Sequence, residues 1–371
     1  MPFADEMISA WTAESLARAI GSVLPGAPLA RLREAPRRLE GLALRERADL
    51  LRDALLSDIP GDYAALAAVI RAARDTSPSF SGWMIWPVTA AVADKAVADG
   101  SASSFDDAMA AMAELTGLLT SEFAIRTLLR HDLDRALATI STWTTSDDVD
   151  VRRLATEGTR PYLPWSVRVP ELLRRPGATV PILDALYRDR AEYVRRSVAN
   201  HLNDLSRDHA DLVDETAARW LADPDANTTW VVRHGLRTLV KRGDPGALAL
   251  LGFSAAEASL EIEGPHLDRA TVAVGESLEI RAAIRNVGDE DARLAIDYVV
   301  HHQKANGHQA PKTFKLTTTT LEPGQTITLR RAHSFRLITT RRYYPGPHAI
   351  SLQVNGVATE RAEFDLVIES S

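Results

Sequence analysis

The segments VRRLATEGTRPYLPW (Val151–Trp165) and VRRSVANHLND (Val194–Asp204) decide the fold of this 371-residue chain. Both begin with Val-Arg-Arg, and a related Val-Arg pair starts at Val232. The three valines are 43 and 38 residues apart, close to the period of two-helix HEAT-type repeats. In such repeats the valine packs between neighbours, while the arginine and later helix positions face a concave surface. The spacing therefore predicts a helical-repeat solenoid; an irregular helical domain is the alternative.

Apolar residues recur at helical spacing between residues 12 and 251, and no run in this region alternates as a strand would. Proline and glycine interrupt the pattern, and at Pro87 we expect a helix to end. Two polar pairs, Thr120-Ser121 and Asp147-Asp148, stand where helix caps are expected. These signals predict a series of short helices.

From Ser259 onward the pattern changes to short runs of period-two alternation, such as SLEIRAAIR and RLAIDYVVHH. Turn sequences such as Ala305-Asn-Gly-His separate them. This arrangement predicts an antiparallel β-sandwich of immunoglobulin-like size. We therefore expect a mainly α chain, with a HEAT-like repeat domain over residues 1–255 and an immunoglobulin-like sandwich over residues 256–371.

The net charge of −7 argues against a nucleic-acid binder, but the charges are unevenly distributed. Residues 1–150 hold 14 basic and 22 acidic side chains, whereas residues 151–255 hold 16 and 13. Between His301 and Arg342 eight lysines and arginines stand against one acid, Glu322. Because phosphate binding depends on local basic surface, these two regions are the candidates for contacting a polyanion.

Several classes of protein are excluded by composition and motifs. The chain has no cysteine, which rules out disulfides and cysteine-based zinc sites and fits a reducing compartment. We find no signal peptide and no apolar run long enough to span a membrane. The Walker, Rossmann, HExxH and GxSxG motifs are missing. We therefore expect no cofactor, and His301, His302 and His308 lack the partners that a metal site needs.

Acids and arginines share one face on each of the two central helices. The residues concerned are Arg153, Glu157 and Arg160 on the first helix, and Arg196, Asn200, Asn203 and Asp204 on the second. Such faces on adjacent helices would line one groove; the alternative is a solvated surface with the local pairs Arg153–Glu157 and Arg196–Asn200. The stretch TRPYLPW favours a site, since its prolines hold Trp165 rigidly near a carboxylate, although a core tryptophan is also consistent with it.

Three segments resemble the AlkC/AlkD family of DNA alkylation-repair glycosylases: TSEFAIRTLL (Thr120–Leu129), RRLATEGTRPYLPW (Arg152–Trp165) and VRRSVANHLNDLSRDH (Val194–His209). The stretch GWMIWP (Gly82–Pro87) and the helix at Trp230 are also similar. The added β-domain resembles the AlkC branch, which carries an immunoglobulin-like C-terminus. The resemblance covers essentially the whole chain.

The resemblance implies a repeat surface that wraps and bends duplex DNA. It implies a cationic alkylated base as substrate, chiefly 3-methyladenine and also 3-methylcytosine and 1-methyladenine, removed without conventional base flipping. The base already carries positive charge, so it leaves without an added proton. The remaining barrier is positive charge on the deoxyribose, which a carboxylate stabilises while it orients water.

These implications assign roles to individual residues. Glu157, Asp204 and Glu122 are the expected catalytic acids, and Trp165 and Arg160 the expected contacts to the lesion sugar. The expected DNA-binding residues are Arg153, Arg195, Arg196, Arg233, His301, His302, Lys304, Arg341 and Arg342. For those in the β-domain, a solvated strand edge is the alternative. No lysine is placed to form a Schiff base, so we expect a monofunctional glycosylase.

The competing function is a non-enzymatic HEAT-type protein that binds damaged or bent DNA or a protein partner. A pure binder gains nothing from acids in a groove that faces phosphates, so Glu157 and Asp204 favour the enzyme. We further expect a monomer without an obligate protein partner, located in a bacterial-type cytoplasm in association with the nucleoid.

Overall fold

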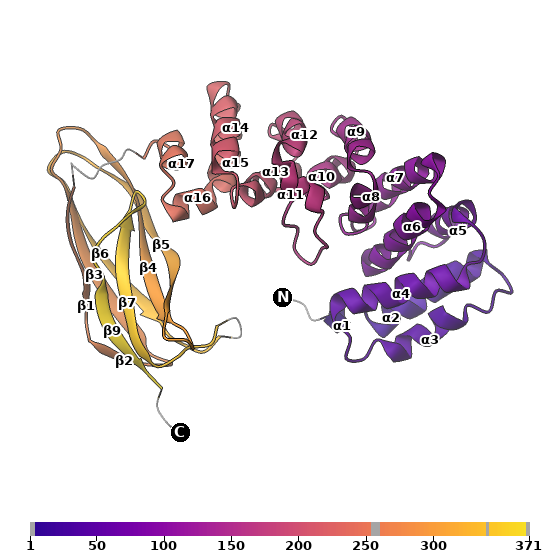
Figure 1. Ribbon diagram of the computed structural model, residues 1–371, viewed down its shortest axis with the longest axis horizontal. Coiled ribbons are helices and arrows are strands. Elements are labelled where there is room, and N and C mark those ends of the chain that lie inside the picture. Colours follow the sequence, from indigo (N-terminus) through magenta and orange to yellow (C-terminus); the bar gives the residue numbers. More distant parts are fainter. Residues whose placement is uncertain (1–3, 254–259, 339–340, 369–371) are drawn as a thin grey trace. The chain divides into compact units, whose positions relative to one another are not determined.

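The computed structural model describes residues 4–253, 260–338 and 341–368 (Figure 1). Contacts divide the chain into two compact units: Met1–Leu205 with Trp220–Gly235, and Ser206–Arg219 with Leu236–Ser371. The expected boundary between residues 255 and 256 lies outside the described residues and stays a prediction. The contacts group residues 206–219 and 236–253 with the sandwich.

The first unit is built from helices, as the apolar spacing predicts (Figure 1). They are α1 (Ala4–Met7), α2 (Ala10–Val23), α3 (Ala30–Arg38), α4 (Leu44–Asp58), α5 (Tyr63–Thr76), η1 (Gly82–Met84), α6 (Ile85–Asp99), α7 (Ala102–Thr116), α8 (Ile125–His131), α9 (Leu133–Trp143), α10 (Val149–Glu157), α11 (Pro170–Arg174), η2 (Pro176–Thr179), α12 (Val180–Leu186), α13 (Glu192–Leu205) and α15 (Thr228–Gly235). Between α13 and α15 lies α14 (Ala210–Ala222), most of which belongs to the second unit.

Side-chain caps mark the starts of α2, α5, α7, α9 and α10, whereas two of the expected signals behave differently. Asp148 caps α10 as expected, accepting a hydrogen bond from the backbone N–H of Asp150. The pair Thr120-Ser121 does not cap a helix, because a turn over residues 122–124 separates it from α8. Pro87 does not end a helix but lies in the first turn of α6. Proline is tolerated there because the backbone N–H of that turn has no partner within the helix.

The HEAT-like prediction is confirmed by the three helices that carry the Val-Arg pairs. Helix α10 packs against α13, and α13 packs against α15. Val151, Val194 and Val232 are buried, as valines between neighbouring repeats should be.

The first arginine of each Val-Arg-Arg has the same structural role in its own repeat. Arg152 donates to the backbone carbonyls of Ser146 and Asp147, 2.9 and 3.0 Å away. Arg195 donates to those of Asp189 and Arg190, 2.6 and 3.1 Å away. In both cases the arginine satisfies carbonyls five and six residues earlier and so fixes the turn before its helix. The two Val-Arg-Arg segments therefore repeat the same hydrogen bonds as well as the same sequence.

The second unit holds α16 (Arg237–Arg242), α17 (Pro245–Leu250) and a β-sandwich (Figure 1). One sheet has the order β1 (Leu260–Leu267), β3 (Ser277–Asn286), β6 (Thr326–Ser334). The other has the order β2 (Thr271–Ala273), β9 (Ala362–Val367), β7 (Gly346–Val354), β4 (Ala292–Gln303), β5 (Gln309–Leu321), and β8 (Val357–Ala358) pairs with β7. The pairings are antiparallel except that β2 runs parallel to β9.

The core of the sandwich comes from alternating residues of facing strands, among them Ile280 and Ile284 of β3 and Leu294 and Ile296 of β4. Strand β4 lies between β7 and β5 and is buried along nearly its whole length. Within the described ranges, no helix combines the length and the apolar character needed to cross a bilayer.

Candidate active site

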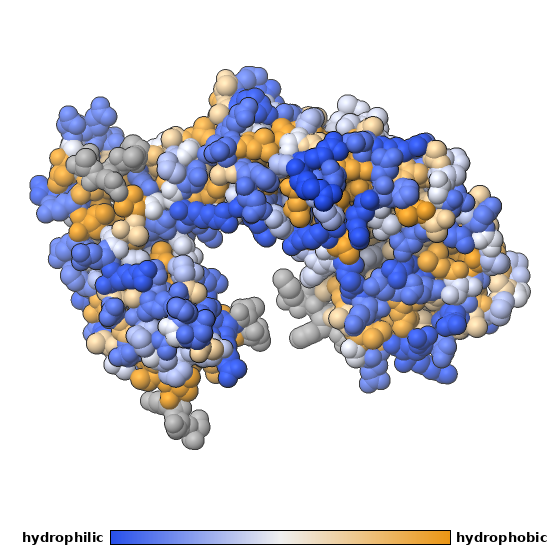
Figure 2. All heavy atoms as spheres, in the orientation of Figure 1, coloured by the Kyte–Doolittle hydropathy of each residue, from blue (hydrophilic) through white to orange (hydrophobic). Residues whose placement is uncertain are grey.

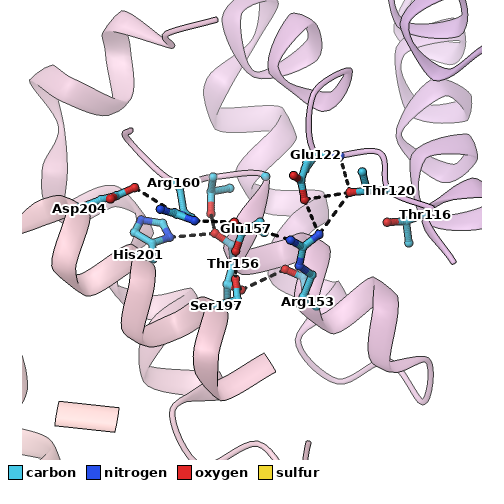
Figure 3. A network of polar contacts seen from close by, with 12 residues as sticks. Thr116, Thr120, Glu122, Arg153, Thr156, Glu157, Arg160, Ser197, His201 and Asp204 are labelled. Carbon is cyan, nitrogen blue, oxygen red and sulfur yellow. Dashed lines mark hydrogen bonds and ion pairs between the residues drawn. The ribbon is translucent and has the colours of Figure 1, made fainter. Parts of the chain in front are cut away.

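Three acids and two arginines form a buried cluster between α10, α13 and the turn before α8 (Figure 3). Glu157 is the last residue of α10, Asp204 lies near the end of α13, and Glu122 lies in that turn rather than on a helix. The three acids are 6%, 2% and 9% exposed, respectively. Charges buried to this extent require partners, which Arg153 and Arg160 supply.

The charges alternate along a continuous chain of ion pairs. Arg153 bonds Glu122 through Nη1 and lies 3.7 Å from Glu157 through Nη2. Arg160 lies 2.5 Å from the same Glu157 oxygen and, through Nε, 2.9 Å from Asp204. With all five groups ionised, this set carries one more negative than positive charge. The buried Arg126, whose charge interacts with those of Asp204 and Glu122, supplies a third positive charge beside this set.

The two glutamates of the cluster differ in acidity. Burial opposes ionisation of Glu157, but Arg153, Arg160 and a hydrogen bond from Ser197 outweigh it and lower the pKa of Glu157. Burial raises the pKa of Glu122; Arg153 offsets this effect only in part, and the charge of Glu157 adds to it. Glu157 is therefore a persistent carboxylate, whereas Glu122 accepts a proton more readily.

Two residues on α13 contact the end of α10, where Glu157 lies. Ser197 donates to its second oxygen, Oε2, at 2.7 Å. His201, which is fully buried, contacts the carbonyl of Thr156 through Nδ1 at 2.9 Å and the hydroxyl of Thr179 through Nε2 at 3.0 Å. Because a carbonyl only accepts, Nδ1 carries the proton and Nε2 accepts one. Burial lowers the pKa of His201 to about 4, so the ring stays neutral.

Neither supporting residue was expected from the sequence, although a signal was present. Val194, Val198 and Leu205 form an apolar stripe on α13. Ser197 and His201 interrupt that stripe, and a polar residue on a buried face must have a partner on the neighbouring helix.

The loop between α10 and α11 is held at its base by a buried arginine. Arg126 of α8 donates to the carbonyls of Gly158 and Arg160 at 3.1 and 2.8 Å, and to that of Val167 at 2.6 Å. Burial lowers its pKa to about 10, so the side chain remains charged at neutral pH. The role of Arg126 was also not predicted, since its position in the sequence is typical of a surface residue on a short helix.

Trp165 lies in this loop and is 47% exposed, so it is not a core tryptophan. Its backbone φ of 58° lies in the left-handed region, which is rare for a bulky side chain. Figure 2 shows strongly hydrophilic residues gathered over α11 and the loop before it.

The arginines expected to hold phosphates fall into three groups. Arg153 and Arg160 lie between carboxylates, with 15% and 10% of their side chains exposed, so they are neutralised within the protein. Arg195 is used by the turn before α13. Arg196 and Arg233 are exposed, and Arg196 pairs with Glu192 rather than with Asn200. Only the third group faces solvent as a phosphate contact requires.

The basic candidates of the β-domain are divided in the same way. His301 and His302 are buried at the end of β4; His301 contacts the hydroxyl of Ser351, and His302 accepts from Nη1 of Arg341 at 2.9 Å. Their burial, with 8% and 5% of the two residues exposed, leaves little surface for direct contact with DNA, and that expected role stays a prediction. Lys304 and Arg342 are exposed, and Arg341 is half-buried.

The Arg153–Glu157 pair exists, but as part of a buried network between helices and not as a solvated surface pair. Across the described part of the chain, no group of three or more His, Asp or Glu side chains is arranged to hold a metal ion.

The comparisons with known proteins agree on one family. Residues 261–368 match the family described as "Uncharacterised protein YhaZ, C-terminal Ig-like domain". The chain is 34% identical to YhaZ of Bacillus subtilis (strain 168) over 325 residues, which cover 88% of each protein. It is also 34% identical to the alkylpurine DNA glycosylase AlkC of Pseudomonas fluorescens, whose structure was solved with DNA containing an abasic-site analogue. That similarity has a TM-score of 0.86 and covers 99% of this chain and 100% of the other. The chain therefore belongs to the AlkC family of DNA alkylation-repair glycosylases, in the branch with a C-terminal immunoglobulin-like domain.

Proposed function

We propose that this protein is a monofunctional DNA glycosylase that hydrolyses the N-glycosidic bond of cationic alkylated bases in duplex DNA. The proposed substrates are 3-methyladenine, 3-methylcytosine and 1-methyladenine. The observation that carries the proposal is the buried alternating cluster, in which three carboxylates face two guanidiniums.

The chemistry needs a site for a transient cation. As the bond from C1′ to the base breaks, its electron pair leaves with the base and neutralises the charge that alkylation placed there. Positive charge then develops on the deoxyribose ring. A fixed carboxylate in a water-poor site stabilises that charge strongly, because it needs no reorganisation at the moment of reaction.

The three acids suit different parts of this reaction. Glu157, whose pKa is lowered and whose two oxygens are both bonded, provides fixed negative charge. Glu122 and Asp204 each use one oxygen for an arginine, which leaves Glu122 Oε1 and Asp204 Oδ1 outside these pairs. Either oxygen can orient the water that attacks C1′. Glu122 is the better acceptor of the water's proton because burial raises its pKa.

Binding is assigned to residues at the surface. Trp165 packs its exposed ring on the lesion sugar, and Arg196 and Arg233 hold phosphates beside it. Lys304, Arg341 and Arg342 add phosphate contacts from the β-domain. Action as a monomer, in the cytoplasm and on nucleoid DNA, is part of the same proposal.

The second candidate is a non-enzymatic protein that binds bent or damaged DNA. Nothing in such a role calls for burying three carboxylates in a protein that binds phosphates, since acids weaken binding to a polyanion. The cluster therefore favours the enzyme.

The test is release of free base. The full chain is incubated with duplex DNA carrying 3-methyladenine, and in parallel with duplexes carrying single 3-methylcytosine or 1-methyladenine lesions. We expect free methylated base, and abasic sites that stay unbroken until alkali is added. DNA binding without release of any base would establish the non-enzymatic alternative, and strand breakage before alkali would contradict the monofunctional reaction.

A further inference from the structure

We infer that Arg45, at the start of α4, is a positioning residue that holds Trp165 in the conformation that presents its ring to the substrate. The inference rests on the proposed function and deepens it, because it assigns a role to a residue that is 120 positions away from Trp165 in sequence.

Trp165 needs external support for its conformation. A left-handed backbone at a tryptophan is sterically costly, and such a residue persists only where its surroundings fix it. The indole ring cannot supply this support through packing, since about half of the residue is exposed. The constraint must therefore act on the backbone of the loop.

The loop has an anchor at its base and another at its tip. At the base, Arg126 binds the carbonyls of Gly158, Arg160 and Val167. At the tip, Nη2 of Arg45 donates to the carbonyl oxygen of Trp165 itself. That carbonyl belongs to the peptide unit after the Cα of Trp165, whose orientation is set by φ and ψ of Trp165, so this hydrogen bond acts directly on the strained residue.

Arg45 is itself positioned by aromatic rings. Its guanidinium lies over the ring of Trp86, 5.7 Å from the centroid, at the distance of a cation–π contact. Trp86 is buried and stacks on Phe123, with ring centroids 4.1 Å apart. Phe123 directly follows Glu122, so a continuous series of contacts connects the exposed Trp165 to an acid of the cluster.

A different role for Arg45 would be direct contact with a phosphate. The two roles predict different losses. A phosphate contact contributes equally to damaged and undamaged DNA, and its removal lowers the slope of log K against log salt by about 1. A positioning residue acts only through Trp165, so its removal affects the lesion and leaves binding to undamaged DNA unchanged.

The experiment is a double-mutant cycle in the full chain, with R45A, W165A and the double variant. Single-turnover release of 3-methyladenine should fall about tenfold in R45A, the size expected for one hydrogen bond from a charged donor. R45A should add nothing further in the W165A background. R45K, which keeps the charge and a donor, should recover part of the rate. The matched control is R18A, because Arg18 is an exposed arginine of α2 that contacts Glu14 and Ser15 of its own helix.

Two further measurements separate the inference from the proposed function. The indole N–H resonance of Trp165, assigned by comparison with W165F, should shift in R45A and not in R18A, whether or not the protein releases base. Affinity for undamaged duplex should stay within about twofold, by the argument above. If the wild type releases base but the losses in R45A and W165A are additive, the role of Arg45 is overturned and the proposed function stands. A reduced salt slope in R45A would have the same consequence. No release by wild type would overturn the proposed function.

Discussion

The replacement Glu157→Gln removes one negative charge from the buried cluster while keeping the shape of the side chain. In the native protein Glu157 lies 2.5 Å from Arg160 and 3.7 Å from Arg153. Each arginine keeps a second carboxylate, Glu122 or Asp204, after the change. The loss of stability should therefore stay below the roughly 3–5 kcal/mol seen when a buried charge loses its only partner. We expect about 1–3 kcal/mol, the usual cost of impairing charged hydrogen bonds.

The effect on rate should be larger than the effect on folding. Loss of one preorganised electrostatic group commonly costs about 3–4 kcal/mol in activation free energy, or roughly 10²–10³-fold in rate. The assay is single-turnover release of 3-methyladenine with enzyme in excess over DNA, alongside urea unfolding of the same preparation. Glu14→Gln on α2 is the matched control, since Glu14 is an exposed acid paired with Arg18 of the same helix. A folded Glu157→Gln variant that releases base within threefold of wild type would refute the role of this carboxylate.

Four other outcomes are expected. Burial raises the pKa of Glu122, so kcat/KM of the wild type should fall with decreasing pH as Glu122 takes up a proton. Glu122→Gln should remove this decrease, and an unchanged pH profile would exclude Glu122 as the base. Arg126→Met leaves three loop carbonyls without their donor and should cost about 1–3 kcal/mol in urea unfolding, whereas wild-type stability would mean that the loop does not depend on it. The pKa of His201 is lowered from 6.5 to about 4, so the unfolded chain binds its proton first; stability should fall by up to about 3 kcal/mol as pH drops through this window, and a non-titrating replacement should reduce that slope in thermal unfolding. Arg342→Ala should lower the salt slope of DNA binding by about 1, and an unchanged slope would remove Arg342 from the interface.

The fold was largely predictable because it depends on periodic patterns. Apolar residues at helical spacing and the repeated Val-Arg pair indicate which residues are buried between neighbouring helices. Period-two alternation does the same for the sandwich. Pro87 shows the limit of such signals. A helix that approaches a proline from the N-terminal side cannot continue through it. The same proline, however, fits the first turn of a new helix, as Pro87 does in α6.

The roles of individual charged residues were less predictable. Arg153 and Arg196 occupy the same place in the two Val-Arg-Arg segments, yet one is buried among acids and the other is exposed. Spacing tells which face of a helix a residue occupies, but not what that face packs against. The burial of His301 and His302 was not foreseen for a similar reason, since alternation along β4 does not reveal that residues on both sides of this strand are buried.

Contacts between distant segments leave no local pattern at all. The hydrogen bond from Arg45 to Trp165 joins helix α4 to the loop after α10. The Arg126 contacts join α8 to the same loop, more than 30 residues later in the chain. Their residue types are ordinary for exposed helix positions, so only the folded chain shows them. Trp86 and Phe123 lie in two of the segments that carry the family resemblance, but nothing in those segments indicates that their rings stack on each other.

The central claim is that the buried carboxylates stabilise positive charge on the sugar. Its most direct test compares the affinity of the protein for two duplexes, one with a cationic pyrrolidine analogue of the abasic sugar and one with the neutral tetrahydrofuran analogue. We predict that wild type prefers the cationic duplex by at least about tenfold, corresponding to roughly 1.4 kcal/mol. The preference should fall toward one in Glu157→Gln and Asp204→Asn and persist in Glu14→Gln. Equal affinity of the wild type for the two duplexes, or an undiminished preference in both acid variants, would contradict the account.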